Sequence, residues 1–401
     1  MSSQEQKIEE LLTRGVAEVI DKEHLKQRLL AGEKLRIKLG IDPTSPNIHL
    51  GRAVVLLKMR DFQELGCKIV LIVGDFTGVI GDTSDKESER PMLSADVIET
   101  NMKSYTEQIG KLINLSQAEV HYNSTWLDEL KYEDIGRQAD TFSLAEFIAR
   151  ENIKMRLDAG KRVSLREVLY PLMQGFDSIA INADVELGGT DQRFNLLAGR
   201  RLQEAHGQPA QDILMMNLIL GTDDRKMSSS WGNTINLFDA PNDMFGKVMS
   251  IPDSLIVSYL VHCTRMPMDM VRKIELDMRE GNMNPRDAKL ELAKEIVTLY
   301  HDKEEALKCE QYFIETFSKG VVPENIPEVS VRVGEKILEV LVKSKIATSN
   351  ADARRKVEQG GVEIGGERVD DWQAVMEEGH AGKVMKVGKK DFVKIVFAKG
   401  E

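Results

Sequence analysis

Short apolar runs alternate with longer stretches of helical periodicity over residues 1–235. Five of the apolar runs predict strands, namely residues 35–41, 69–73, 120–122, 184–187 and 213–218. The run 69–73 (IVLIV) is apolar at every position, which is typical of a strand buried on both faces of a parallel sheet. Three intervening stretches predict helices, namely residues 53–65, 94–113 and 192–206. This alternation predicts a doubly wound parallel α/β domain whose ligands lie at the carboxyl ends of its strands.

The strand pattern stops after residue 235, and the rest of the chain divides into three parts. Residues 236–320 carry Met, Leu and Ile at helical spacing and predict an α-helical domain. Pro323 and Pro327 stand among small and polar residues, so residues 321–334 are predicted to form a linker. Residues 335–401 contain two helical patterns, 335–344 and 350–359, followed by a strand pair around Gly365-Gly366. This last part is predicted to be a small α+β domain.

Composition and charge narrow the class of protein. The chain has 401 residues, 42% of them hydrophobic and 30% charged, which indicates a globular protein of two or three domains. Its net charge of −11 argues against a protein that coats nucleic acid over its whole surface. Cys67, Cys263 and Cys309 lack metal-ligand spacing, so we expect no disulfides, no protein-bound metal and a reducing cytoplasm. The polar start and the lack of a long apolar run predict no signal peptide and no membrane segment.

The segment DPTSPNIHLGR, residues 42–52, directly follows the first predicted strand. Pro43 and Pro46 disfavour an early helix, and Gly51 allows close approach of the backbone. His49 then lies near the start of the next helix, where free N–H groups favour a phosphate. An ordinary strand-to-helix turn with an incidental histidine is the alternative interpretation.

Two further loops carry charges suited to phosphates. The segment RKMSSSWGN, residues 225–233, joins two cations to three hydroxyls, although a solvated surface loop is the alternative. The segment GDFTGVIGDTSDKESER, residues 74–90, follows the second predicted strand and contains three glycines. In it Asp82 is a candidate ligand for an ammonium group, and Lys86 and Arg90 are candidate ligands for phosphate.

A third group of polar residues has the spacing of one helical face. Tyr170, Gln174 and Asp177 in LYPLMQGFD are four and three residues apart among apolar neighbours. A surface stripe would be richer in Lys and Glu, so the pattern favours the lining of a pocket. Nearby, LGGTDQ at residues 187–192 ends a predicted strand with two glycines and Asp191, an arrangement that commonly holds a ribose diol.

These segments together resemble a known family. HLGR and KMSSS resemble the HIGH and KMSKS signatures of class I aminoacyl-tRNA synthetases, in the family's order. YPLMQGFD and LGGTDQ resemble the substrate-pocket motifs of tyrosyl-tRNA synthetases, and SNADARRKVEQGGVEIGGERV resembles the ribosomal-protein-like RNA-binding domain of the bacterial-type enzymes. The resemblance implies a Rossmann-type catalytic domain over residues 1–235, a helical tRNA-binding domain over 236–320 and an RNA-binding domain over 335–401.

The resemblance also implies a reaction and a role for each matching residue. ATP would activate tyrosine to tyrosyl-adenylate with release of pyrophosphate, and tyrosine would then pass to the terminal adenosine of its tRNA. Magnesium would accompany ATP. The residues implied for tyrosine, with Asp177 accepting the phenolic hydrogen, are Gly40, Asp42, Asp82, Tyr170, Gln174 and Asp177. Those implied for ATP and adenylate are Asp42, His49, Gly51, Gly189, Asp191, Gln192, Lys226, Met227 and Ser228. Those implied for catalysis through positioning and positive charge are Thr44, His49, Arg52, Lys86, Arg90, Lys226 and Ser229.

Three positions depart from the family pattern. Arg52 replaces the second histidine of HIGH and brings a permanent charge that can reach phosphate. Ser229 replaces the second lysine of KMSKS, for which the neighbouring Arg225 is a candidate substitute. Lys38 stands where many tyrosyl enzymes have an aromatic hydroxyl. If Lys38 faces the pocket, recognition of the phenol depends more strongly on Asp177.

Basic residues gather in two clusters of the last domain. The resemblance implies that they bind tRNA, and the residues concerned are Lys343, Lys345, Arg354, Arg355, Lys356, Lys386 and Lys389. Solvated helix ends and turns are the alternative interpretation. The resemblance further implies a homodimer whose catalytic domains are in contact and whose two subunits share one tRNA.

Three other functions stay open at this point. A tryptophanyl-tRNA synthetase shares the signatures, but the Tyr170, Gln174 and Asp177 face argues against it. A small-molecule adenylyltransferase would have no use for the RNA-binding domain. A non-catalytic, synthetase-like RNA-binding protein is favoured only by Arg52 and Ser229.

Overall fold

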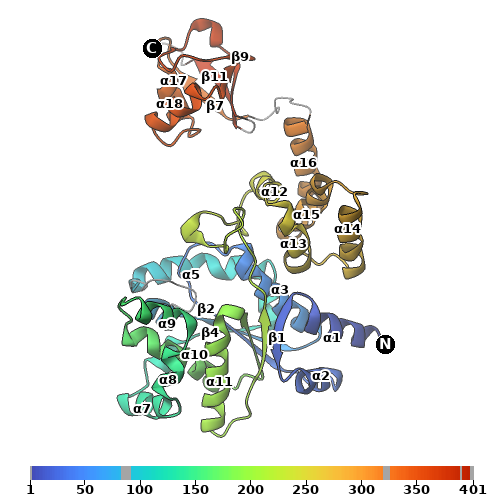
Figure 1. The fold of residues 1–401 in the computed structure, drawn as a ribbon, viewed down its shortest axis with the longest axis vertical. Coiled ribbons are helices and arrows are strands. Elements are labelled where there is room, and N and C mark those ends of the chain that lie inside the picture. The colour runs from blue at the N-terminus through green and yellow to red at the C-terminus, as the bar shows by residue number, and fades with distance from the viewer. Residues whose placement is uncertain (1, 83–91, 319–325, 389–390, 398–401) are drawn as a thin grey trace. The chain divides into compact units, whose positions relative to one another are not determined.

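The structure is a computed structural model that describes residues 2–82, 92–318, 326–388 and 391–397. The chain divides into two compact units, Met1–Ala306 and Leu307–Glu401 (Figure 1). Lys86, Arg90 and Lys389, which the sequence assigns to phosphate or tRNA, lie outside the described residues.

A six-stranded sheet with the order β1-β6-β5-β2-β3-β4 forms the centre of the first unit. Its strands are β1 (Val16–Ile20), β2 (Arg36–Ile41), β3 (Lys68–Val73), β4 (Glu119–Tyr122), β5 (Val185–Gly189) and β6 (Asp212–Met216). Strand β1 runs antiparallel to β6, and the other neighbours are parallel. The chain builds outward from β2 to β4 and then from β5 to β6, so the direction of winding reverses between β2 and β5. A ligand site is expected where the carboxyl ends of these two strands separate. The doubly wound parallel sheet is confirmed; β1 is an addition to it.

Helices cover both faces of this sheet. Those before β6 are α1 (Ser3–Thr13), α2 (Lys22–Leu30), α3 (Leu50–Glu64), α4 (Asp75–Ile80), α5 (Ala95–Gly110), α6 (Ser124–Leu127), α7 (Tyr132–Asp140), α8 (Leu144–Ile148), α9 (Glu151–Asp158), α10 (Leu165–Ala180) and α11 (Arg193–Ala205). Helix α3 packs on β2, β3 and β5, whereas α11 packs on β5 and β6 and against α10. Leu196 of α11 forms a buried cluster with Ile213 and Met215 of β6. Because helices cover both faces of the sheet, the ends of its strands are where a ligand site can form.

Further helices follow the sheet in the sequence, as the helical spacing of residues 236–320 predicts. They are α12 (Pro241–Met249), α13 (Ile256–Cys263), α14 (Met268–Glu280), α15 (Pro285–Tyr300) and α16 (Lys303–Phe313). Helix α13 packs against α3 as well as against α14 and α15. Most of this helical segment therefore belongs to the same compact unit as the sheet.

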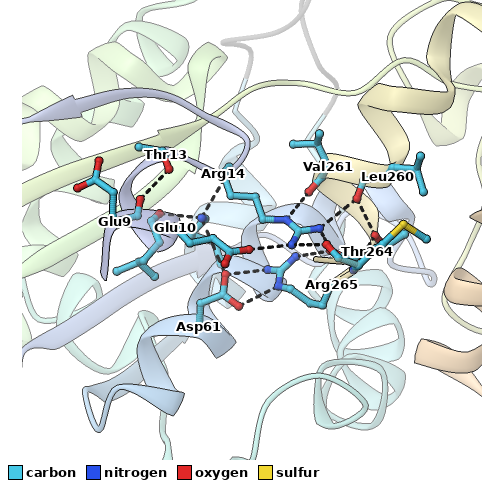
Figure 2. A network of polar contacts seen from close by, with 12 residues as sticks. Glu9, Glu10, Thr13, Arg14, Asp61, Leu260, Val261, Thr264 and Arg265 are labelled. Atoms are coloured by element: carbon cyan, nitrogen blue, oxygen red, sulfur yellow. Dashed lines mark hydrogen bonds and ion pairs between the residues drawn. The ribbon is translucent and has the colours of Figure 1, made fainter. Parts of the chain in front are cut away.

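A buried polar network joins α1 to the turn after α13 (Figure 2). The Arg14 guanidinium donates hydrogen bonds of 2.9–3.1 Å to the backbone oxygens of Leu260, Val261, Thr264 and Met266. Asp61 of α3 accepts two hydrogen bonds from Arg265, at 2.8 and 2.9 Å. Lys58 of α3 donates to the backbone oxygens of Leu11 and Arg14, and its burial lowers its pKa to about 8. The side chains of Arg14 and Lys58 thus bind backbone carbonyl groups at the ends of α13 and α1. These contacts anchor α3.

The second unit contains a five-stranded sheet with the order β7-β11-β10-β8-β9. Its elements are β7 (Glu328–Val331), α17 (Ile337–Lys343), α18 (Asn350–Glu358), β8 (Val362–Ile364), β9 (Glu367–Arg368), β10 (Val384–Val387) and β11 (Asp391–Phe397). Strand β7 pairs in parallel with β11. The linker predicted over residues 321–334 is therefore wrong for residues 328–331, because Val329 and Val331 pack into the core of this unit. The strand begins directly after Pro327, which disfavours a helix but not a strand start.

Within the described part of the chain, no single helix is long and apolar enough to cross a membrane. The bent pair Pro241–Met249 and Asp253–Cys263 passes this test only when the two helices are taken together.

Candidate active site

One cavity lies at the carboxyl ends of the central strands and gathers the motifs of the first unit. Its lining includes every described residue that the sequence assigns to tyrosine, ATP or catalysis: Gly40, Asp42, Thr44, His49, Gly51, Arg52, Asp82, Tyr170, Gln174, Asp177, Gly189, Asp191, Gln192, Lys226, Met227, Ser228 and Ser229. These residues come from segments far apart in the sequence. Their individual roles remain predictions.

Backbone pairing brings the HLGR and KMSSS segments to the same side of this cavity. The Leu50 N–H donates to the Ile235 oxygen at 2.9 Å, and the Leu237 N–H donates to the Ile48 oxygen at 2.9 Å. The Met227 side chain is buried against Gly51, whose N–H lies 3.3 Å from the Met227 sulfur. A Cβ added to Gly51 would lie 3.0 Å from the His49 ring, so glycine preserves the space that this ring occupies. His49 precedes the first residue of α3, as the sequence predicts.

The KMSSS loop is folded around one buried side chain. Asn233 is 3% exposed and accepts from the Ser228 N–H at 2.8 Å, while its amide nitrogen donates to the Lys226 oxygen at 3.0 Å. Lys226 projects from this loop and forms an ion pair of 3.0 Å with Asp191. Arg225, the candidate substitute for the missing lysine, instead pairs with Asp223 and stacks on Trp231, and it does not line the cavity.

Arg52 lies at the wall of the cavity beside another predicted residue. Its guanidinium donates to the Thr44 hydroxyl at 3.1 Å and to the Tyr105 hydroxyl at 2.7 Å. Tyr105 lies on α5, so the arginine connects the DPTSP turn to that helix. The side chain therefore has a structural role in addition to any contact that it makes with phosphate.

A group of carboxylates and hydroxyls occupies the part of the cavity next to β2. Asp42 accepts hydrogen bonds from the Tyr170 hydroxyl at 2.8 Å and from the Thr77 hydroxyl at 2.7 Å. Poor solvation of the Asp42 carboxyl raises its pKa to about 6. Asp82 accepts from the Gln192 amide at 2.7 Å. Two carboxylates and a phenol oxygen close together form a suitable environment for a substrate ammonium group.

A third carboxylate, Asp177, lies at the buried end of the cavity. It is 3% exposed and accepts hydrogen bonds from the Trp126 indole at 2.8 Å and from the Asn123 amide at 3.3 Å. Burial raises the pKa of Asp177 to about 7, while the nearby Lys38 charge and the two hydrogen bonds oppose this shift. A partly desolvated carboxylate held by neutral donors is a strong acceptor for a phenolic hydroxyl.

Trp126 and Asn123 were not among the residues predicted from the sequence. Asn123 follows β4 directly and Trp126 lies in α6, so both stand at the carboxyl edge where ligands are expected. Their position after the predicted strand 120–122 was the one signal that could have identified them.

Lys38, which the sequence leaves without an assigned direction, does not line the cavity. Its side chain is fully buried behind the cavity wall, where its ammonium group pairs with Glu186 at 2.9 Å. The condition under which a pocket-facing Lys38 would increase the dependence of phenol recognition on Asp177 is therefore not met.

One cluster in the described ranges has the residue types of a metal site. Asp21, His24 and Asp212 each offer a ligand atom, and these atoms lie within 4.8 Å of one another. His24 already bonds to Asp212 at 3.0 Å, and the Arg28 guanidinium lies 4.0 Å from the same carboxylate. The arginine charge disfavours a cation there, and none of the three residues lines the cavity.

The predicted tRNA-binding cations that the structure describes lie on the surface of the second unit. Most are paired with acids: Lys343 with Glu335, Arg354 with Glu358, Arg355 and Lys356 with Asp352, and Lys386 with Glu363. Exposed pairs of this kind contribute little to stability, so phosphates can compete for the cations. Lys345 is exposed and has no ion pair within the described residues.

Comparisons with known proteins agree with this geometry. Residues 30–318 match the family of tRNA synthetases class I (W and Y). The first unit thus belongs to a class I tRNA synthetase. Residues 317–395 match the tyrosine–tRNA ligase SYY-like C-terminal domain.

Relatives of similar length narrow the family further. A tyrosine–tRNA ligase from Carboxydothermus hydrogenoformans is 43% identical over 97% of this chain and 98% of its own length. One from Thermotoga maritima is 42% identical over 96% of each chain. The chain therefore belongs to the tyrosine–tRNA ligase family.

Solved structures show the same fold. The tyrosyl-tRNA synthetase of Archaeoglobus fulgidus, solved with L-tyrosine, has a TM-score of 0.61 and 24% identity, and the match covers 76% of this chain and 99% of that one. The truncated mitochondrial enzyme of Coccidioides posadasii also has a TM-score of 0.61, at 20% identity over 78% of this chain and 92% of that one.

Proposed function

We propose that this chain activates tyrosine with ATP and transfers it to the 3′-terminal adenosine of its cognate tRNA. The observation that carries the proposal is that one cavity joins both signature segments to a buried carboxylate, Asp177. The phosphates of ATP bind at the side of the cavity formed by HLGR and KMSSS, and the phenol of tyrosine binds at the side formed by Asp177. The two substrates then meet between Asp42 and Asp191.

Each predicted residue acts by holding or balancing charge. Asp82, Tyr170 and Gln174 bind the tyrosine ammonium, which directs the tyrosine carboxylate toward the α-phosphorus of ATP. His49 and Thr44 stabilise charge that develops on the β- and γ-phosphates as the carboxylate attacks. Lys226 leaves Asp191 for the departing pyrophosphate, and Asp191 is then available to a ribose hydroxyl. Catalysis of this kind requires positioning and preorganised charge rather than a protein nucleophile.

Magnesium accompanies ATP in the proposed reaction. It is carried by the phosphates, which are hard oxygen ligands that suit this ion. The three buried cysteines, none of which forms a disulfide in the described residues, and the need for ATP and tRNA support the reducing cytoplasm as the place of action.

The proposed tRNA contact uses the cations of the second unit. Lys345, Arg355 and Lys386 are among these residues, and each phosphate that they neutralise makes binding more sensitive to salt. The functional division into residues 1–235, 236–320 and 335–401 is part of this proposal.

The proposed dimer uses apolar side chains on α7, α8 and the start of α10. Tyr132 is 93% exposed, Leu144 is 66% exposed and Leu165 is 76% exposed, and the three helices share one hydrophobic cluster. Large exposed apolar side chains on helices that pack together are candidates for an interaction surface. A second copy of this chain is the proposed partner, and Leu144→Glu with Leu165→Glu should convert the dimer to a monomer in sedimentation equilibrium.

Pyrophosphate exchange tests the activation step. The purified chain is incubated with ATP, magnesium and labelled pyrophosphate, together with tyrosine, tryptophan or phenylalanine. Label should enter ATP with tyrosine alone. Exchange driven by tryptophan would transfer the assignment to a tryptophanyl-tRNA synthetase, and a folded protein that binds tRNA without any exchange would be a non-catalytic RNA-binding protein.

A further inference from the structure

A fully buried ion pair lies behind the tyrosine end of the cavity. Lys38 of β2 and Glu186 of β5 are register partners in the parallel sheet, so their side chains leave it on the same face. They are 0% and 1% exposed, and the Lys38 ammonium lies 2.9 Å from a Glu186 oxygen. Their neighbours in the same row are Val70 and Ile213, which are also buried. Two charges in this setting need close partners to be tolerated.

Helix α10 supplies the partners of the lysine. The Lys38 ammonium donates to the backbone oxygen of Gln174 at 2.8 Å and to the Ser178 hydroxyl at 2.7 Å. With Glu186 as the third acceptor, all three N–H groups of the ammonium are used. Lys38 is therefore held in a fixed position below the turn of α10 that carries both Gln174 and Asp177.

Glu186 determines how the Gln174 side chain is oriented. An ionised carboxylate can only accept hydrogen bonds, and it accepts from the Gln174 amide nitrogen at 3.1 Å. It accepts as well from Ser178 at 3.1 Å and from Gln211. The Gln174 amide oxygen has no hydrogen-bond partner within the described residues, and Gln174 lines the cavity. Since the nitrogen is directed to Glu186, the oxygen remains as an acceptor for a substrate.

The packing around Lys38 and Glu186 leaves these two side chains no room to rearrange. A Cβ added to Gly199 of α11 would lie 2.6 Å from the Gln211 amide and 3.2 Å from a Glu186 oxygen. Glycine at this position lets α11 approach α10 closely over the carboxylate. The close packing of α10 and α11 therefore fits the Glu186 carboxylate and its hydrogen-bond partners in their observed positions.

We propose that Glu186, paired with Lys38, is a positioning residue that turns the oxygen of the Gln174 amide toward the ammonium of the amino-acid substrate. A neutral group at position 186 can donate as well as accept a hydrogen bond. The Gln174 amide can then reverse and present its N–H groups to the substrate ammonium. Removal of the Lys38 ammonium takes away the ion-pair partner that holds the Glu186 carboxylate in place, which has the same consequence. The inference rests on the proposed function, because it assigns the substrate ammonium to Gln174.

Glu186→Gln is the first test, since it preserves the shape of the side chain and removes the charge. In pyrophosphate exchange we expect the KM for tyrosine to rise roughly tenfold, the size of a lost charge-assisted hydrogen bond at its lower limit. The KM for ATP should stay within about twofold of the unmodified protein. Lys38→Met should give a similar rise, and the double variant should be no worse than either single one, because both changes act through one amide.

Substrate analogues separate positioning from a general loss of packing. Tyramine retains the ammonium and the phenol, whereas 3-(4-hydroxyphenyl)propanoate retains the phenol and lacks the ammonium. As competitive inhibitors, tyramine should weaken in Glu186→Gln to the same degree as tyrosine, and the propanoate should be unaffected. Equal weakening of both analogues, or multiplicative effects in the double variant, would overturn the inference.

A second buried pair provides the matched control. Arg156 and Glu167 are 2% and 0% exposed, and neither lines the cavity. Glu167→Gln should lower the thermal midpoint without changing the KM for tyrosine. A rise in that KM equal to the rise in Glu186→Gln would show that any lost buried pair has this effect, which contradicts the positioning role. Lack of exchange in the unmodified chain would instead contradict the proposed function.

Discussion

Trp126 provides the sharpest test of how the phenol is recognised. Its indole N–H donates to Asp177 at 2.8 Å, and Trp126→Phe removes this donor while it retains an aromatic ring. A hydrogen bond to a charged group contributes about 1.5–3 kcal/mol. One pKa unit corresponds to about 1.4 kcal/mol, so the pKa of Asp177 should rise by roughly one to two units from its value of about 7.

The sign of the pH effect follows from which form of Asp177 binds the phenol. The ionised carboxylate is the active acceptor, so activity falls as pH drops through its pKa. With a higher pKa in the variant, the acid limb of kcat/KM for tyrosine moves to higher pH. At pH 6 the variant should be about 10- to 100-fold less active, and near pH 9.5, where Asp177 is largely ionised in both proteins, the difference should nearly disappear.

The assay is pyrophosphate exchange at subsaturating tyrosine between pH 5.5 and 9.5, with the KM for ATP measured alongside. Trp372→Phe is the control, because it makes the same chemical change in the second unit, where Trp372 stacks with Arg354. If Trp126→Phe keeps its thermal midpoint and its acid limb coincides with that of the unmodified protein, the account of Asp177 is wrong.

The remaining predictions concern the nucleotide, the RNA and the core. Lys226→Gln should reduce pyrophosphate exchange by roughly 10²- to 10³-fold, whereas Arg225→Gln, outside the cavity lining, should stay within a few-fold; equal losses would refute the assignment. Lys345→Ala with Arg355→Ala should weaken tRNA charging and flatten its salt dependence while exchange stays unchanged, and an unchanged salt slope would remove these residues from the RNA contact. Gly199→Ala should lower the free energy of unfolding by about 1–3 kcal/mol in urea, because the new methyl group meets Gln211 at 2.6 Å; no loss would show that the packing can relax.

Much of the fold could be predicted because short apolar runs alternate with helical patterns, and the run 69–73 is apolar at every position. Strand β1 was not predicted, since Val16–Ile20 is partly exposed and lies at an edge of the sheet. In the second unit, β10 and β11 were not predicted, and each contains a single half-buried lysine within a short strand. Alternation over so few residues gives a weak signal, and tertiary packing decides the outcome.

The residues of the candidate site also differ in this respect: some are identified by their local sequence, and others only by the three-dimensional fold. Residues within contiguous motifs, such as His49 and Lys226, were identified because each motif supplies its own context. Trp126 stands alone in its segment, where a tryptophan usually indicates core packing. The Lys38 and Glu186 pair required the strand order, because only the adjacency of β2 and β5 places the two charges together.

Aminoacylation itself is the most direct test of the central claim. The purified chain is incubated with unfractionated tRNA, ATP, magnesium and each labelled amino acid in turn, and acid-precipitable label is measured. The account predicts that tyrosine alone accumulates on tRNA. Accumulation of a different amino acid, or none at all by a protein that is folded and binds tRNA, would contradict it.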